Sequence, residues 1–421
     1  MARSRSLSPA AYLLLAVTAL LVLGGAMMIY SASSVADYVK HGDSAYHLKK
    51  QLIYVVAGGL VMYALSWWDV RGRRRDGSDM QGAQVLGWSI WGASLLGLIA
   101  VSIIGVTGGG ATSWLDLGPA SIQPSEYAKL GCVILTAVML VGYRRGQLSG
   151  RDLLIRLGIV LGPVVALIMA QPDMGTTASL LLAVGLLLWM GGVPGAWVAA
   201  TLAVTVPAAV AFVAVAGYRM RRVTAFLDPW SDPIDSGYQI IQSLYAFGSG
   251  GLFGTGLGLS RQKFFYLPAA HTDFILAIIG EELGLIGTLA VVLAFGAFAY
   301  AGIRIAREAA SPFGRLLAGG LTAMIIGQAL MNMAAVTGLM PITGIPLPFV
   351  SSGGSSLTLT LVCVGLILAV ARTGGQSRMR LVSPMDKTRG SDRAGTSQRR
   401  RDGGTHLPRT DRRRSAYRKR A

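Results

Sequence analysis

The chain has 421 residues, of which 52% are hydrophobic and 14% are charged, and its mean hydropathy is +0.54. This composition excludes an ordinary soluble domain, because a soluble domain of this size would carry far more charge. Apolar runs of roughly 18–25 residues recur along the chain, each long enough to cross a bilayer core of about 30 Å. We therefore expect an all-α polytopic membrane protein, since helices satisfy their own backbone polar groups in lipid.

Ten apolar segments are predicted to be transmembrane helices. They are residues 10–31, 51–68, 84–107, 126–143, 153–171, 176–193, 196–216, 273–303, 312–340 and 355–372. The first follows Arg3 and Arg5 and is longer than the roughly 7–15-residue core of a signal peptide, so we expect an uncleaved span. With these spans, the arginine-rich loops at 69–83, 144–152 and 304–315 lie on the same side of the membrane as the amino terminus. The positive-inside rule assigns that side to the cytoplasm. Both termini are therefore expected in the cytoplasm.

The carboxyl-terminal segment differs in composition from the rest of the chain. From Arg372 to Ala421 it contains sixteen Lys and Arg residues, four Asp residues and few large apolar residues. Such a segment cannot bury enough apolar surface to fold. We predict a transmembrane domain over residues 1–372 and a basic, disordered cytoplasmic tail over residues 373–421. The tail either follows the positive-inside rule alone or binds anionic lipid or a partner, and nucleic acid is the least favoured ligand.

A pair of opposite charges opens the fourth predicted span. Gln123-Pro124-Ser125 resembles a helix start, and Glu126 and Lys129 follow it. A spacing of three residues places the two side chains on one helix face. The pattern is consistent with an internal ion pair and with a place in a polar cavity.

Residues 217–272 form a large predicted extracytoplasmic loop, and loops of this length are usually functional. We expect an interfacial helix near residues 238–247. The loop carries basic residues against the orientation rule, namely Arg219, Arg221, Arg222, Arg261 and Lys263. Guanidinium groups bind phosphate through bidentate hydrogen bonds, so these residues either bind phosphate or are charges tolerated in a long loop. The glycines of residues 248–258 indicate a turn or a close approach to phosphate.

Asp273 stands where this loop meets the eighth predicted span, directly after His271 and Thr272. Ionisable residues at such a depth are costly and mark functional sites. We expect Asp273 to open the helix of residues 273–303, where the helix dipole and free amide donors would keep the carboxylate ionised. It is a candidate general base or metal ligand, and a simple helix cap is the alternative.

Two further polar features lie in apolar surroundings. Glu281 and Glu282 come about 12–13 Å after Asp273 along the same span, at ~1.5 Å per residue, and cannot reach the same bound group. Their burial requires an internal partner or a water-lined path, and we favour an internal network. Residues 341–356 are rich in Pro, Gly and Ser. We expect a broken, non-helical element there, lining a cavity.

Short motifs occur in a fixed order from about Leu14 to Ala371. They are Tyr30-Ser31-Ala32-Ser33, Trp114 with Leu117-Gly118-Pro119, Gln123-Pro124-Ser125-Glu126 with Lys129, Gln171-Pro172-Asp173, Asp228-Pro229-Trp230, Gly237-Tyr238-Gln239 with Gln242-Ser243, His271-Thr272-Asp273-Phe274, Glu281-Glu282-Leu283-Gly284, and Leu347-Pro348-Phe349-Val350 with Gly353-Gly354-Ser355-Ser356. The ordered set resembles the SEDS family (shape, elongation, division and sporulation), the FtsW, RodA and SpoVE proteins. The resemblance implies ten transmembrane helices.

The resemblance implies a peptidoglycan glycosyltransferase that polymerises lipid II, the undecaprenyl-pyrophosphate-linked disaccharide peptide, in the bacterial plasma membrane. It implies Asp273 as the catalytic carboxylate. The expected substrate-binding residues are Trp114, Gln123, Glu126, Lys129, Arg221, Gln239, Lys263, His271, Thr272, Ser351 and Ser352. The implied partners are a cognate class B penicillin-binding protein, which would supply transpeptidation, and other division proteins.

Two departures from the family pattern stand out. Ala269 occupies a position where the family often has an acidic residue, and residues 108–113 lack the basic side chains that often precede the tryptophan. The continuous segment SRQKFFYLP at residues 260–268 is closer to the division-type FtsW than to the elongation-type RodA. We therefore expect a role in septal cell-wall synthesis.

In the expected reaction, Asp273 takes a proton from the 4-hydroxyl of the acceptor sugar, whose oxygen attacks the anomeric carbon of the donor. Undecaprenyl pyrophosphate leaves, and Arg or Lys groups or a divalent cation (Mg²⁺ or Mn²⁺) would stabilise it. No cluster of His and Cys indicates a structural metal. The alternatives are a lipid II flippase, an elongation-type, RodA-like polymerase, and a non-catalytic scaffold for a synthase.

Overall fold

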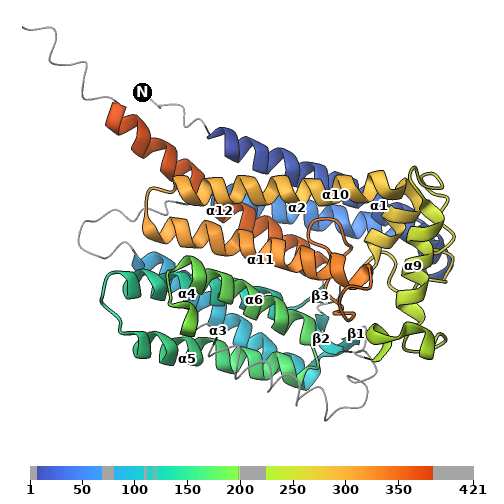
Figure 1. The fold of residues 1–421 in the computed structure, drawn as a ribbon, viewed down its shortest axis with the longest axis horizontal. Helices are drawn as coiled ribbons and strands as arrows, with labels where there is room; N and C mark the ends of the chain where they lie inside the picture. Colours follow the sequence, from blue (N-terminus) through green and yellow to red (C-terminus); the bar gives the residue numbers. More distant parts are fainter. Residues whose placement is uncertain are drawn as a thin grey trace, which may run out of the picture. The chain divides into compact units, whose positions relative to one another are not determined.

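The computed structural model describes residues 7–68, 80–108, 111–116, 118, 121–197, 199 and 224–382. Met1–Arg378 form one compact unit and Met379–Ala421 a second. The first unit is a bundle of long helices, with α9 at one end of it (Figure 1).

The helices and strands have the following bounds. The first half of the chain contains α1 (Pro9–His41), α2 (Tyr46–Ser66), α3 (Gln81–Ile104), α4 (Pro124–Arg144), α5 (Gly150–Ala170) and α6 (Met174–Met190). The second half contains the 3₁₀ helix η2 (Pro229–Ser231), α9 (Tyr238–Gly250), α10 (Ile275–Glu308), α11 (Pro312–Val336) and α12 (Gly354–Val382). Between α3 and α4, the strands β1 (Val106–Gly108), β2 (Ala111–Asp116) and β3 (Ser121–Ile122) pair antiparallel in the order β1-β2-β3.

Length and apolar composition make this a multi-pass membrane protein. Within the described residues, eight helices are long and apolar enough to cross a membrane, and α6 is a shorter apolar helix. The predicted span at 196–216 lies almost entirely outside the described residues. The polytopic helical architecture expected from composition is confirmed.

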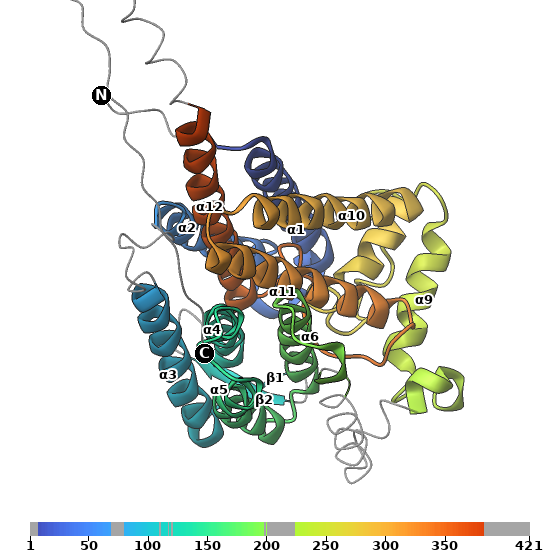
Figure 2. The same ribbon diagram turned by 60° about the vertical axis from the view of Figure 1, so that its left-hand side comes forward.

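The core of the bundle is built around α4, α11 and α12. In α4, 94% of the most apolar window is buried, against 83% in both α11 and α12 and only 11% in α2. α4 contacts α3, α5, α6 and α11, while α10 contacts α1, α9 and α11. Figure 2 shows α3, α4, α5 and α6 grouped together, with α11 between this group and α10. The polar residues of α4 and α11 are therefore held in the interior.

The structure corrects several predicted boundaries. α1 continues to His41, ten residues beyond the predicted end of the first span, because residues 32–41 contain no proline or glycine. The eighth span begins at Ile275 rather than at Asp273, extends to Glu308 and is broken at Gly284. The small sheet of residues 106–122 was not predicted, because its strands are only two to six residues long.

Two irregular segments agree with their predictions. The expected helix near residues 238–247 is α9, which buries Ile240, Ile241 and Ala246. Residues 341–353 are non-helical and run through the interior, where Ile345, Leu347 and other side chains are buried. These two segments flank the start of α10, where Asp273 lies.

Candidate functional site

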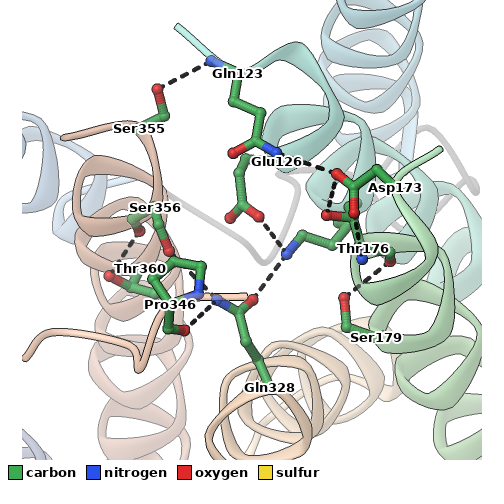
Figure 3. A network of polar contacts seen from close by, with 11 residues as sticks. Gln123, Glu126, Asp173, Thr176, Ser179, Gln328, Pro346, Ser355, Ser356 and Thr360 are labelled. Carbon is green, nitrogen blue, oxygen red and sulfur yellow. Dashed lines mark hydrogen bonds and ion pairs between the residues drawn. The ribbon is translucent and has the colours of Figure 1, made fainter. Parts of the chain in front are cut away.

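A buried ion pair stands at the start of α4. Lys129 Nζ lies 2.7 Å from Glu126 Oε1, and the two side chains are 0% and 1% exposed. Lys129 Nζ also donates to Gln328 Oε1 at 2.8 Å. These two contacts place the ammonium group between Glu126 and Gln328, which are both labelled in Figure 3. The i, i+3 spacing thus produces the predicted internal pair, and burial makes each charge dependent on the other.

Gln328 connects this pair to the non-helical segment of residues 341–353. Its Nε2 donates to Pro346 O at 3.1 Å and to Ser356 Oγ at 3.3 Å. Glu126 Oε2 is buried and has no hydrogen-bond partner within the described chain. An ionised oxygen of this kind can accept a hydrogen bond from a bound hydroxyl group, so the ion-pair and polar-cavity interpretations of Glu126 are compatible.

A second carboxylate, Asp173, belongs to the same region and was not among the predicted site residues. Its Oδ2 accepts from Gln123 Nε2 at 3.2 Å and from Thr176 Oγ1 at 2.7 Å. Its Oδ1 accepts from Thr176 N at 2.9 Å, which makes Asp173 the N-cap of α6. Gln123 N in turn donates to Ser355 Oγ at 3.0 Å, so Gln123 joins α4, α6 and α12 (Figure 3). The signal that could have identified Asp173 is its position directly before an apolar span.

Asp273 lies in a turn two residues before α10, not inside the helix. The first turn of α10 holds no acidic residue, so the expected stabilisation of Asp273 as a first-turn helix residue is not realised. Instead, Asn332 of α11 donates from Nδ2 to Asp273 O and to Ile345 O, at 2.8 Å each. Asn332 is one helical turn after Gln328, so α11 connects Asp273 with the Glu126–Lys129 pair.

The segment around Asp273 is held by two serines near the end of the non-helical segment. Ser351 Oγ donates to Thr272 O at 2.6 Å and accepts from Leu347 N at 2.8 Å. Ser352 N donates to His271 O at 2.9 Å. The predicted residues His271, Thr272, Ser351 and Ser352 are therefore brought together, and they meet through their backbones as much as through their side chains.

Two residues that the sequence did not single out lie beside His271: His47 packs against its ring, and Asp37 binds His47. The rings of His47 and His271 have centroids 4.5 Å apart. His47 N donates to Asp37 Oδ2 at 3.0 Å, and the His47 ring contacts the other carboxylate oxygen. Burial, followed by the nearby His47, lowers the pKa of His271 to about 4, against a smaller opposing effect of Asp37. His271 is therefore neutral near pH 7.

Glu281 and Glu282 hold the long loop to α10. Glu281 accepts from the Ser260 hydroxyl, from Arg261 N at 2.9 Å and from Gln262 N at 3.3 Å. Glu282 accepts from Ser31 Oγ at 2.7 Å. The predicted internal network is confirmed.

Lys263 belongs to this network. Lys263 Nζ is 3.6 Å from Glu282 Oε1 and also contacts Gly258 O. Its side chain is 5% exposed. The charge of Lys263, expected to bind substrate, is therefore occupied inside the protein.

The glycine-rich segment of residues 248–258 packs its backbone on the backbone of α10. Thr255 N and Gly256 N donate to Glu281 O and Glu282 O at 2.9 and 3.0 Å. A Cβ atom on Gly254 would lie 2.1 Å from Glu282 O, and one on Gly284 would lie 2.4 Å from Gly254 N. Both residues also have positive φ, +82° and +68°, which favours glycine. The turn interpretation is confirmed, and close packing explains these two glycines.

Two of the remaining predicted residues, Trp114 and Gln239, lie in elements that contact the helices of this site. Trp114 is in β2, half-buried and paired with Val106, and β2 contacts α3 and α4. Gln239 is half-buried in α9, which contacts α10 and α11. Arg221 lies outside the described residues. Within the described residues, no group of three or more His, Cys, Asp and Glu side chains could hold a metal ion.

Comparison with known proteins places these features in one family. Residues 11–375 match the family of FtsW, RodA and SpoVE, described as cell cycle proteins. The stage V sporulation protein E of Bacillus subtilis is 42% identical, over 86% of this chain and 96% of its own. A "Probable peptidoglycan glycosyltransferase FtsW" of Geobacter sp. (strain M18) is 38% identical, over 85% and 96%.

Solved structures show the same fold. A chain from the study "Structural coordination of polymerization and crosslinking by a peptidoglycan synthase complex" superposes with a TM-score of 0.67 at 30% identity, covering 87% of this chain and 98% of that one. The rod shape determining protein RodA of Thermus thermophilus gives 0.61 at 27% identity, over 85% and 95%. The chain therefore belongs to the FtsW, RodA and SpoVE family of cell cycle proteins.

Proposed function

We propose that this protein is a peptidoglycan glycosyltransferase that polymerises lipid II. The family supports the enzyme class, because FtsW relatives carry the name peptidoglycan glycosyltransferase. The observation that carries the site assignment is the link along α11. Asn332 holds the backbone of Asp273, and Gln328, one turn away, holds the buried Glu126–Lys129 pair. A candidate base and a polar, charged interior thus meet at one end of the bundle.

In the proposed mechanism, Asp273 acts as general base. It takes the proton from the 4-hydroxyl of the acceptor sugar as that oxygen attacks the anomeric carbon of the donor, and undecaprenyl pyrophosphate leaves with inversion at this carbon. Such base assistance typically contributes ~10²–10⁴-fold in rate. The half-buried position of Asp273 before α10 supports this role, since a base must reach the substrate and still be held in place.

The other predicted residues, together with Asn332, are assigned one of two proposed roles, contact with the substrate or positioning of other groups. Glu126 Oε2 and Asn332 Oδ1, both buried and without a protein partner in the described chain, are acceptors for hydroxyl or amide groups of the substrate. Trp114, Gln123, Gln239, His271, Thr272 and Ser352 remain proposed substrate contacts, with Lys129 positioning Glu126. Ser351 and Lys263 are now assigned to holding the loop and the segment around Asp273.

The charge of the leaving pyrophosphate requires cations outside this network. Arg261 is exposed in the described loop, and Arg221 belongs to the same extracytoplasmic loop. Both are proposed to bind the pyrophosphate through charge-assisted hydrogen bonds. The described donor set does not fit a resident metal site, and the mechanism proposed here passes through no metal ion.

The cellular role is proposed from the sequence. The segment at 260–268 favours the division type, and therefore septal synthesis. The Arg-rich loops favour cytoplasmic termini in the bacterial plasma membrane. A class B penicillin-binding protein is the proposed partner, because a similar solved chain belongs to a synthase complex described as coordinating polymerisation with crosslinking.

Polymerisation of labelled lipid II by the purified protein with its partner tests this proposal. We expect glycan strands to form. A parallel assay of lipid II movement across liposome membranes distinguishes a polymerase from the alternative, a flippase. Movement without strand formation would overturn the proposal. The structure removes the main support for that alternative, because Glu281 and Glu282 have partners inside the fold.

A further inference from the structure

A cavity lies among α3, α4 and α5, far from Asp273. Its volume is about 470 Å³, within the roughly 300–1,000 Å³ of pockets that hold small molecules. α3 begins, α4 ends and α5 begins at this end of the bundle, whereas Gln123 and Asp173 lie at the opposite ends of α4 and α5. The deepest lining residues of the cavity, Leu135 and Val160, are twelve and thirteen residues from Gln123 and Asp173 along the chain, roughly 18–20 Å at ~1.5 Å per residue. None of the lining residues belongs to the candidate catalytic site. The cavity is therefore distinct from the candidate catalytic site.

The lining of the cavity is amphiphilic. Its polar side chains are Gln84, Gln147 and Arg156, each within two turns of a helix terminus. Deeper along the same helices, the lining is apolar and includes Trp88, Leu135 and Val160. A ligand that fits such a lining has a polar head at the end of the bundle and an apolar chain directed toward its middle.

Two walls of the cavity belong to helices that expose most of their apolar surface. Only 22% of the apolar window of α3 and 28% of that of α5 are buried, whereas α4, the third wall, is 94% buried. Trp88 is 45% exposed and Ile159, also in the lining, is 56% exposed. In a membrane, lipid chains cover such surfaces, so a bilayer lipid has direct access to the cavity.

The charge around the polar end selects the kind of lipid. Arg144, Arg145 and Arg151 are exposed next to the cavity, in addition to Arg156 in its lining. In the described segment that joins α4 to α5 and in the first turn of α5, the acid is Asp152, which is engaged in the capping box of α5 with Ser149. A guanidinium group binds a phosphodiester through charge-assisted hydrogen bonds, and clusters of basic residues at the membrane surface attract anionic lipids.

We propose that this cavity binds an anionic phospholipid, with its phosphate on Arg156 and the amides of Gln84 and Gln147, and an acyl chain along Trp88, Leu135 and Val160. Arg156 makes the cavity selective for a negatively charged head group. The apolar lining requires that the ligand also carry an acyl chain. The site is a structural lipid site, separate from the one that binds lipid II.

Native mass spectrometry of the purified full-length protein tests this proposal, with titrations of phosphatidylglycerol and phosphatidylcholine in parallel. We expect preferential binding of phosphatidylglycerol. Arg156→Gln should weaken it by at least ~10-fold, as expected for one charge-assisted contact. Arg307→Gln, an exposed arginine in the last turn of α10, is the matched control and should bind like the wild type.

A second variant tests the cavity itself. Ile159→Trp should block the apolar lining and reduce phosphatidylglycerol binding without altering the charge, and thermal unfolding checks that the variant is folded. Equal binding of both lipids by the wild type would overturn the proposal. So would equal losses in Arg156→Gln and Arg307→Gln, or undiminished binding in Ile159→Trp.

Discussion

At the scale of single residues, the Glu126–Lys129 pair has the largest expected effect on stability. Both side chains are fully buried, so removing one charge leaves the other unpaired in the interior. We predict that Lys129→Met lowers the free energy of unfolding by about 3–5 kcal/mol. Thermal unfolding in detergent measures this change. The double variant Glu126→Gln/Lys129→Met should recover most of the loss, and a double variant no more stable than Lys129→Met would contradict the pairing.

His271 is predicted to make stability depend on pH. Its pKa in the folded protein is lowered from an ordinary value of 6.5 to about 4, mainly by burial and then by His47, while Asp37 opposes this shift. Between these two values the unfolded chain binds more protons than the folded one, so stability falls as the pH decreases from about 6.5 to about 4.

His271→Gln should flatten this dependence, as followed by unfolding midpoints across that range. The variant keeps a polar side chain of similar size. An unchanged pH profile in His271→Gln would show that other groups carry the dependence.

Residue contacts were predictable from sequence where they are local. The i, i+3 spacing indicated that Glu126 faces Lys129. The contacts of Gln328 and Asn332 were not predicted, because they join α11 to segments that are distant in the chain. His47 and Asp37 were missed for a similar reason. His47, in α2, packs on His271 and binds Asp37, which lies in the part of α1 beyond its predicted end.

At the scale of elements, the glycine-rich segment and α10 form one packed unit. Gly254→Ala places a Cβ atom against Glu282 O and requires a strained backbone at φ +82°. We predict that this substitution detaches residues 251–263 from α10 and shifts Asp273. Polymerase activity should then fall by at least ~10²-fold, because a displacement of about 1 Å can cost that much in rate.

Gly248→Ala is the matched control, because Gly248 lies in α9 and a Cβ there meets nothing within 4 Å. Limited proteolysis reports detachment of the loop, and it should increase in Gly254→Ala alone. Equal activity and equal proteolysis in both variants would contradict the role of this contact.

Elements were predicted well where apolar length decides them. The spans of α2 to α6 and of α12 were recognised to within a few residues of their starts. Two features were not predictable from hydropathy, the small sheet at 106–122 and the break in α10 at Gly284. Both depend on backbone pairing or packing against other segments, which a single segment does not reveal.

At the scale of the whole molecule, the basic tail is predicted to be dispensable for chemistry. α12 ends at Val382, and the following residues are charged, with few large apolar side chains. A chain truncated after Val382 should polymerise lipid II at the wild-type rate in detergent. A loss of turnover with normal partner binding would show that the tail contributes to the reaction.

The central claim is that Asp273 is the base of the reaction, and Asp273→Asn with purified lipid II and the partner transpeptidase tests it most directly. The substitution keeps the size of the side chain and removes its basicity. We predict normal folding and partner binding, and glycan-strand formation lowered by at least ~10²-fold. Asp235→Asn, an exposed residue of the same loop, should polymerise normally. Near wild-type polymerisation by Asp273→Asn would contradict the assignment and transfer the base role to another carboxylate, with Glu126 the next to test.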